Sequence, residues 1–329
     1  MSQPPYHLRP NKAVDRFLLV EILKRLGKKY DLADYTYYGF GGPFLEDCRL
    51  LCEHLPEIRL VSIENDPEIY KRQKFHKFNR KLTLIEKDFQ GFIAGHDLGE
   101  GKQIFWLDYT KCNFRCLQEF QVVIQRVSDY SVVRLTINAD KIARLKIRAN
   151  VEKYVKTSEW RNFVDNFNTE YGAVLPNRID DPEYFYPGEK SLSLLCKMIR
   201  IAAERARPTN SGTVFQVLNA SYYRDGATML SVTGIICPIE KVADIRKHFT
   251  QLPFINLTWE PAHKIDMPIL STKERLNLER HLPTEHYNGR ELLQVLGYNF
   301  DDDRKTTIEK LRQYAYFYKY YPQFARIAI

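Results

Sequence analysis

Residues 35–66 read YTYYGFGGPFLEDCRLLCEHLPEIRLVSIEND, and this stretch decides the fold. It opens with a β-rich run of tyrosine and threonine, and the glycine turn GFGG follows directly at 39–42. We expect a helix at about 43–55 and a second apolar strand at 59–63, which closes on Glu64. The order of strand, glycine turn, helix, strand and acid is typical of the first half of a doubly wound nucleotide-binding fold.

The residue types of this stretch suit a nucleotide. Glycine lets the backbone turn sharply at the strand end and leaves no Cβ between the backbone and a ligand. Glu64 stands at the tip of the next strand, where a carboxylate can accept two hydrogen bonds from a ribose diol. A dinucleotide fingerprint needs a third glycine where this chain has Phe44, and no Gly-Lys-Ser/Thr follows the turn. The sequence therefore disfavours a pyrophosphate loop, and with it an NAD-dependent oxidoreductase.

Acidic residues also follow the next two predicted strands. Asp88 and Phe89 come after the third strand, and Asp108 and Tyr109 end the apolar run QIFWL at 103–107. A continuously apolar run is expected of a central parallel strand that is buried on both faces. The chain therefore offers an acid at the end of three successive strands.

The order and spacing of these motifs resemble the class I S-adenosylmethionine-dependent methyltransferases. The resemblance covers roughly residues 30–140 and recurs near 213–237. It implies that the glycine loop lies against the methionine part of the cofactor, that the acid after the second strand binds the ribose, and that the acid after the third reaches the adenine. The cofactor-binding residues implied for S-adenosylmethionine are Gly39, Gly41, Gly42, Glu64, Asp88 and Phe89.

Asp108 and Tyr109 are the predicted catalytic residues, facing the methyl acceptor. Open α/β sheets bind ligands at the carboxyl ends of strands near the switch in strand order, and the first and fourth strands flank that switch. Methyl transfer requires an acceptor that is oriented and, where needed, deprotonated. Similar amino-methyltransferases carry two prolines after the acid, which this chain lacks, so the acceptor atom stays open. A structural role for Asp108 in tying down the loop is the alternative.

Three further residues are predicted to bind substrate. Apolar residues recur at helical spacing over 11–26, and the polar side of this helix carries Lys12 and Arg16. Leading helices of similar methyltransferases cap the cofactor site or contact substrate, although solvated basic residues are the plainer interpretation. Asn138 ends a predicted fifth strand at 131–137, where it either lines the site or begins the next loop.

The fold class we predict is α/β, with a doubly wound, Rossmann-like sheet that is mostly parallel. Asp225-Gly226 between two β-rich runs predicts an antiparallel hairpin, which similar methyltransferases also have as their last two strands. We expect a methyltransferase-like domain at residues 1–237, with a helical insertion at about 141–212. A small, mainly helical region follows at 238–329, where Ser271 and Glu274 form a capping-box pattern.

The net charge of +8 is concentrated in two segments. Residues 1–30 hold seven Lys or Arg against two acids, and residues 141–161 hold seven against two. Clustered basic segments favour an anionic partner such as nucleic acid, whereas a solvated helix face is the alternative. The aromatic C-terminus could stack bases, but packing against the core or a second subunit is favoured.

The six cysteines include two CxxxC pairs, which permit a zinc site, but we expect reduced core thiols and no metal. No apolar run approaches the length that spans a bilayer, and the N-terminus lacks the apolar core of a signal peptide, so we expect a cytoplasmic protein. The predicted function is S-adenosylmethionine-dependent methyl transfer to an undetermined acceptor, with a macromolecule such as nucleic acid favoured. The alternative is a non-catalytic nucleotide- or nucleic-acid-binding partner protein with a degenerate pocket.

Overall fold

The computed structural model describes residues 9–142, 153, 155–250, 252 and 255–322 of the chain. Its contacts divide into two compact units. The sheet unit comprises Val20–Tyr222 and Ala227–His263, and the C-terminal unit comprises Met1–Leu19, Tyr223–Gly226 and Lys264–Ile329. Contact density does not measure independent folding, so the predicted domain boundary between residues 237 and 238 stays a prediction.

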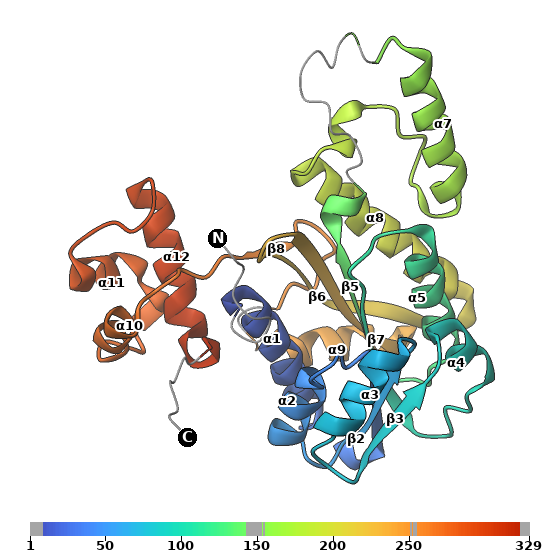
Figure 1. The fold of residues 1–329 in the computed structure, drawn as a ribbon, viewed down its shortest axis with the longest axis horizontal. Coiled ribbons are helices and arrows are strands. Elements are labelled where there is room, and N and C mark those ends of the chain that lie inside the picture. The colour runs from blue at the N-terminus through green and yellow to red at the C-terminus, as the bar shows by residue number, and fades with distance from the viewer. Residues whose placement is uncertain (1–8, 143–152, 154, 251, 253–254, 323–329) are drawn as a thin grey trace. The chain divides into compact units, whose positions relative to one another are not determined.

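The fold is built on one sheet with the strand order β3-β2-β1-β4-β5-β7-β6-β8 (Figure 1). Strands β1 to β5 pair in parallel, and β7 pairs antiparallel with β5. The predicted fold class is therefore confirmed. The strands are β1 (Tyr35–Gly39), β2 (Arg59–Glu64), β3 (Leu82–Glu86), β4 (Lys102–Asp108), β5 (Val132–Asn138), β6 (Thr213–Arg224), β7 (Thr228–Pro238) and β8 (His263–Ile265).

The helices of the sheet unit follow the strands in alternation, as a doubly wound fold requires. They are α2 (Glu46–His54), α3 (Pro67–His76), α4 (Phe89–Gly95), α5 (Phe114–Arg126), α7 (Ser158–Tyr171), α8 (Glu189–Ala206) and α9 (Val242–Phe249). Helix α1 (Pro10–Leu26) precedes the first strand. The C-terminal unit holds α10 (Thr272–Glu279), α11 (Gly289–Leu296) and α12 (Arg304–Phe317).

The core lies between the sheet and the helices α4, α5 and α8. Phe92 of α4, Phe120 of α5 and Leu195 of α8 are buried in one cluster with the strand residues Phe105 and Val133. All seven residues of β5 and the five central residues of β4 are buried. The prediction that QIFWL is a central strand, buried on both faces, is therefore confirmed.

The predicted antiparallel hairpin is also confirmed, and its strands are longer than expected. Strand β6 runs to Arg224, whereas alternation in the sequence suggested an end near Leu218. Every residue from Phe215 to Ser221 is buried, so this strand has two covered faces and lacks the alternating pattern that marks a half-exposed strand.

One helix begins later than its sequence indicates. We expected α2 to start at Pro43, but its first helical residue is Glu46. Gly41 and Gly42 both have φ of +57°, and Leu45 has φ of +56°. These left-handed residues hold the segment after β1 in a turn, so the chain cannot enter the helix at the proline.

The C-terminal unit forms the predicted helices. Ser271 accepts a hydrogen bond from the Glu274 backbone, and the Glu274 side chain accepts one from the Ser271 backbone, which confirms the capping box. The predicted basic segment at 141–161 lies largely outside the described residues. Within the described chain, no helix is long and apolar enough to cross a membrane.

Candidate active site

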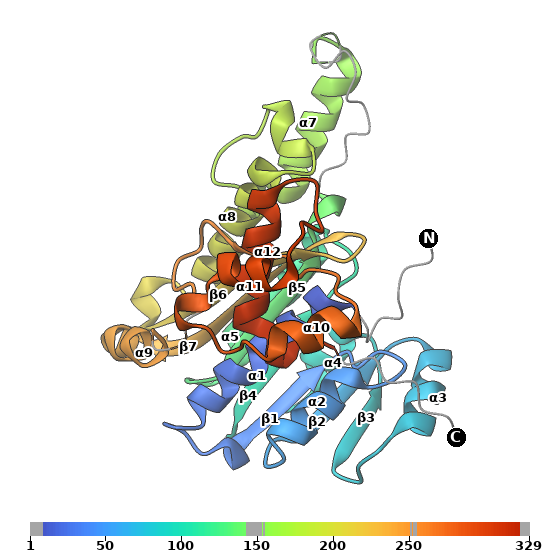
Figure 2. The same ribbon diagram turned by 90° about the vertical axis from the view of Figure 1, so that its left-hand side faces the viewer.

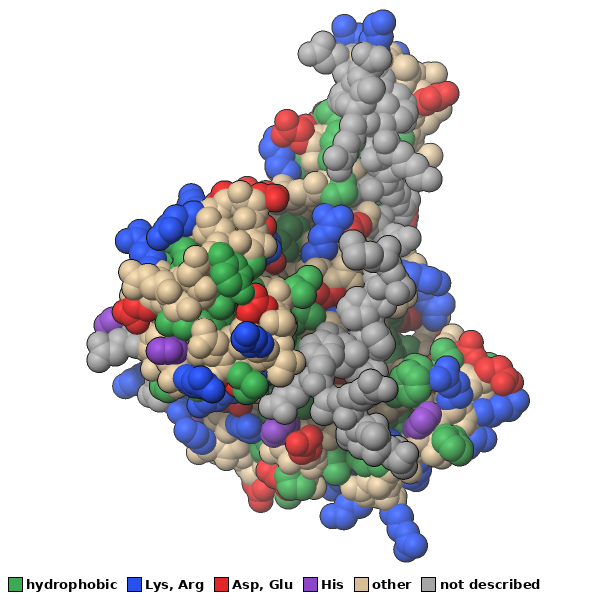
Figure 3. All heavy atoms as spheres, turned by 60° about the vertical axis from the view of Figure 1, so that its left-hand side comes forward, with side chains coloured by type: hydrophobic (Ala, Val, Ile, Leu, Met, Phe, Trp, Pro, Cys, Tyr) green, Lys and Arg blue, Asp and Glu red, His purple; other side chains and the backbone are tan. Residues whose placement is uncertain are grey.

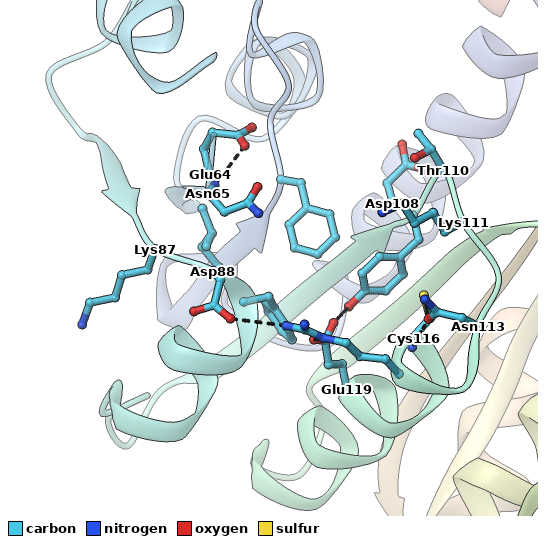
Figure 4. A pocket seen from close by; sticks show the side chains of 15 residues that line it. Glu64, Asn65, Lys87, Asp88, Asp108, Thr110, Lys111, Asn113, Cys116 and Glu119 are labelled. Carbon is cyan, nitrogen blue, oxygen red and sulfur yellow. Dashed lines mark hydrogen bonds and ion pairs between the residues drawn. The ribbon is translucent and has the colours of Figure 1, made fainter. Parts of the chain in front are cut away.

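A pocket of about 450 Å³ opens where β1, β2, β3 and β4 end (Figure 4). Because β1 lies between β2 and β4, the strand order reverses here, which is where open α/β sheets bind ligands. The charged and aromatic residues that line it are Phe40, Glu64, Lys87, Asp88, Phe89, Asp108, Tyr109, Lys111, Arg115 and Glu119. Five of the eight residues predicted for cofactor binding and catalysis, Glu64, Asp88, Phe89, Asp108 and Tyr109, therefore meet in one pocket.

Glu64 is held in place by the turn that follows β2. One carboxylate oxygen accepts hydrogen bonds from the backbone N–H groups of Asn65 and Asp66, both at 2.9 Å. Burial raises the pKa of Glu64, and these two backbone donors lower it in part. The second oxygen is left to accept hydrogen bonds from a ligand in the pocket.

Asp88 has two structural roles at the start of α4. Its side chain caps the helix by accepting a hydrogen bond from the backbone of Gly91 at 3.2 Å. Its other oxygen pairs with the Arg115 guanidinium at 3.3 Å. The sequence allowed either an N-cap or a ligand-binding acid, and this geometry combines a cap with a position in the pocket wall.

Tyr109 and Arg115 converge on the buried carboxylate of Glu119. The Tyr109 hydroxyl donates to one oxygen, and Arg115 Nε donates to the other at 2.7 Å. Burial raises the pKa of Tyr109 well above its usual value, and the neighbouring Glu119 raises it further. Tyr109 is therefore a protonated hydrogen-bond donor in this site.

Three aromatic rings form one wall of the pocket. Phe40 lies edge-on to Phe89 at 5.5 Å and edge-on to Tyr109 at 5.1 Å between ring centroids. Such rings offer an apolar surface on which an adenine or another flat group can rest. Phe40 is the second residue of GFGG, so the glycine turn itself supplies part of this wall.

The glycine turn is shaped by contacts that no other residue would fit. A Cβ at Gly41 would lie 2.3 Å from the Ser62 hydroxyl, and a Cβ at Gly39 would lie 2.2 Å from the Tyr37 hydroxyl. The predicted glycines do not line the pocket with side chains, which they lack, but they position Phe40. Whether they contact a cofactor stays a prediction.

The predicted substrate residues lie elsewhere. Asn138 is buried at the end of β5, and its side chain accepts a hydrogen bond from Asp140, so it begins the next loop. It does not line the pocket. Lys12 and Arg16 are buried residues of the C-terminal unit. The backbone N–H of Lys12 donates to Asp225 at 2.8 Å, and a substrate role for these three residues stays a prediction.

Within the described residues, no group of His, Cys, Asp and Glu is arranged to hold a metal ion. All six cysteines are free. Cys116 borders the pocket, where its thiol contacts the Asn113 side chain at 3.1 Å, and burial raises its pKa. The site chemistry therefore depends on carboxylates, basic side chains and aromatic rings.

A model of the family described as "Putative O-methyltransferase" matches residues 4–329. The chain belongs to this family. The predicted class I methyltransferase resemblance is thereby confirmed, and the protein is a methyltransferase. No curated protein matches the chain.

Solved methyltransferase structures overlap with this family member at low identity. Trm1 from Pyrococcus horikoshii with S-adenosyl-L-methionine shares 11% identity over 74% of this chain and 61% of its own, with a TM-score of 0.44. Human N-acetylserotonin methyltransferase with SAM shares 11% identity over 68% of this chain and 56% of its own, with a TM-score of 0.32. A putative O-methyltransferase from Klebsiella pneumoniae shares 12% identity over 71% and 83%, with a TM-score of 0.38.

Sequence reasoning missed several residues of the site. Phe40 was visible within GFGG, but the glycines around it drew the interpretation. Arg115 and Glu119 are spaced four residues apart on α5, which is the spacing of a helical ion pair. That spacing gave no sign that Arg115 also reaches Asp88 from a different element.

Proposed function

We propose that this chain transfers a methyl group from S-adenosylmethionine to a hydroxyl oxygen of a macromolecule, with nucleic acid as the favoured class. One observation carries the proposal. The carboxylates at the ends of β2 and β4, and the one that caps the helix after β3, surround a single pocket at the reversal of strand order. The oxygen acceptor follows from the family to which the chain belongs.

The pocket fits the proposed cofactor. Ligand pockets commonly have volumes of roughly 300–1,000 Å³, and this one has about 450 Å³. Glu64 offers an oxygen for a ribose diol, Asp88 offers one for an amino group of the base, and Phe40 with Phe89 offers an apolar wall for the ring. These residues would hold the adenosyl part, and the turn around Gly41 would lie beside the remainder.

When bound, the cofactor supplies a methyl group activated by a positively charged sulfur. The acceptor oxygen forms its new bond to that carbon while the carbon–sulfur bond breaks and its electron pair stays on sulfur. The Asp108 carboxylate, at the pocket edge beside the acceptor, would take the proton that the hydroxyl loses. Tyr109 would orient the acceptor as a neutral donor, because burial and Glu119 keep its phenol protonated.

The preference for a macromolecular acceptor rests on charge and shape. The pocket mouth carries Lys87 and Lys111, both exposed, next to the four carboxylates of the lining. Basic side chains at the rim would hold the phosphates of a large acceptor while the reacting hydroxyl enters. A cytoplasmic location, expected from the sequence, belongs to the same proposal.

Isothermal titration with S-adenosylmethionine and S-adenosylhomocysteine tests the proposal directly. We expect micromolar binding to the intact chain, loss of binding in Glu64→Ala, and unchanged binding in the exposed control Glu57→Ala. Transfer of a radiolabelled methyl group to RNA, DNA or protein pools would then identify the acceptor class. Absence of binding to the intact chain would overturn the proposal, and binding without turnover on any pool would favour the non-catalytic alternative.

A further inference from the structure

The helix α3 and the loop after it carry a continuous basic surface. Six Lys and Arg side chains lie between Glu68 and Glu86, and no acidic residue separates them. All six are exposed. We define the α3 patch as these cations with two neighbouring rings: Lys71, Arg72, Lys74, Lys77, Arg80, Lys81, Phe44 and Phe75.

The charge of the α3 patch is largely unneutralised. Lys71 pairs with Glu68 at 2.6 Å. Among the described residues, none of the other five cations forms an ion pair with an acidic side chain. A solvated helix in an ordinary protein usually intersperses acids with its bases. The α3 patch therefore projects a local positive field that favours a polyanion.

Exposed aromatic rings are interleaved with these cations. Phe75 is 85% exposed, whereas large apolar side chains are normally buried. The His76 ring lies edge-on to both Phe44 and Phe75, at 5.2 Å in each case. The Arg72 guanidinium lies 4.8 Å from the centre of the Phe44 ring. This alternation of flat rings and cations is how proteins hold single-stranded nucleic acid.

The α3 patch is rigidly supported from below. Asp66 caps the helix by accepting hydrogen bonds from Glu68 and Ile69, with Pro67 in the first turn. Gln73 is fully buried on the inner side of the same helix and bonds to the sheet. The basic side chains therefore project from a fixed element, so little ordering is required when a ligand binds.

The α3 patch is continuous along the chain with the candidate active site. Glu64 and Asn65 line the pocket, and Asp66 directly after them caps α3. At the other end of the patch, β3 leads from Lys81 to Lys87, which also lines the pocket. In Figure 3, Lys and Arg side chains gather around hydrophobic and histidine side chains at the right-hand edge, the side on which Figure 2 places α3.

We propose that the α3 patch binds single-stranded nucleic acid, with phosphates on its lysines and arginines and a base stacked on Phe75. This inference rests on the proposed function in one respect, because it names the class of acceptor that the pocket would methylate. A membrane surface or an acidic protein would require neither a flat ring facing outward nor a strand-like array of cations. These two partners are outcomes of the test.

Fluorescence anisotropy with labelled single-stranded RNA and DNA oligonucleotides, read at several salt concentrations, tests the proposal on the full chain. Lys74→Gln/Lys77→Gln/Lys81→Gln is expected to weaken binding at least about tenfold and to lower the salt dependence by about two to three contacts. The control Arg205→Gln/Lys241→Gln/Lys247→Gln removes the same charge from exposed positions elsewhere in the sheet unit and is expected to bind more nearly as the unaltered chain does.

A second variant separates stacking from charge. Phe75→Ala is expected to weaken binding by at least about fivefold without altering the salt dependence. Val122→Ala, a partly exposed apolar residue of α5, serves as its control. Because Phe75 is exposed, its removal should leave the fold intact, which circular dichroism would check.

Three results would overturn the inference: no binding of either oligonucleotide, equal binding by patch and control variants, or tighter binding of phosphatidylserine vesicles or polyglutamate through the same residues. Titration of the patch variants with S-adenosylmethionine keeps this test apart from the proposed function. Cofactor binding without oligonucleotide binding would remove only the α3 patch proposal. Oligonucleotide binding without cofactor binding would remove only the methyl-transfer proposal.

Discussion

The side-chain amide of Gln73 donates a hydrogen bond to the carbonyl oxygen of Gly42, with 3.0 Å between nitrogen and oxygen. The amide oxygen of the same side chain accepts from the Ser62 hydroxyl at 3.1 Å. Gln73 thus joins α3 to both the glycine turn and the second strand. The turn that positions Phe40 in the pocket wall depends on a residue that lies thirty-one positions further along the chain.

Replacement of Gln73 by leucine, which has a similar volume, should therefore destabilise the protein and loosen the glycine turn. We expect a loss of about 1–3 kcal/mol in the free energy of unfolding, because the buried Ser62 hydroxyl and the Gly42 carbonyl lose a partner. Urea denaturation measures this loss, and titration measures weaker S-adenosylmethionine binding. Gln118→Leu, on the exposed side of α5, is the matched control and should change neither quantity much. Equal effects of the two substitutions would contradict the role given to Gln73.

The contrast between Gly41 and Gln73 shows how far the sequence could lead. The glycine turn was predictable, because glycine at a strand end has a local conformational cause that needs no knowledge of neighbours. Gln73 sits within a helix rich in Lys and Arg, and only the packing of α3 on the sheet distinguishes it from its exposed neighbours. Local signals predicted the strands and their terminal acids, whereas the contacts between elements required the fold.

The pH dependence of cofactor binding should reveal the environment of Glu64. Burial raises the pKa of this carboxyl in the folded protein above its usual value, and the backbone donors at Asn65 and Asp66 offset only part of the rise. The proposed ribose contacts need the ionised form. Affinity for S-adenosylmethionine should therefore fall as the pH drops, beginning above the value at which an ordinary glutamate, with a pKa of about 4.3, would titrate.

Titration calorimetry over a pH range in which circular dichroism remains constant measures this fall. Glu64→Gln removes the titrating group, so its weaker binding should stay flat over the same range. The sign for stability is opposite to the sign for binding. A carboxyl whose folded pKa is raised holds its proton more tightly in the native state, so its contribution to stability declines as the pH rises through the window above the unfolded value. Parallel pH profiles for the two proteins would show that another group controls binding.

The bond between Tyr109 and Glu119 predicts a positioning role for the tyrosine. Because burial and Glu119 raise the pKa of Tyr109, the rate of methyl transfer should show no rise on the alkaline side that Tyr109→Phe abolishes. The same variant should lose about 1–3 kcal/mol of stability, since the buried Glu119 carboxylate keeps only Arg115 as a printed partner. Tyr298→Phe is a matched control, because Tyr298 makes the same type of bond to Glu274 at an exposed site. An alkaline limb that disappears in Tyr109→Phe would instead make the phenol a base.

Asp88 shows a second limit of sequence reasoning. Its place after the third strand indicated a ligand-binding acid, and its place before a helix indicated a cap. The structure gives it the cap and an ion pair with Arg115, while its position in the pocket wall is kept. A single pattern could not separate these roles, because the residue that joins them comes from α5.

Gly289 predicts where the C-terminal unit is least tolerant of substitution. A Cβ at this position would lie 2.1 Å from the backbone oxygen of Ile308 and 2.8 Å from the backbone nitrogen of Arg312, so α11 would have to move away from α12. Because backbone atoms cannot rotate aside, Gly289→Ala should cost about 1–3 kcal/mol or more. Gly172→Ala places its Cβ in open space and should be nearly neutral or slightly stabilising. Thermal unfolding of both variants decides the matter, and a Gly289→Ala protein as stable as the Gly172→Ala control would mean that the two helices are not in close contact at this glycine.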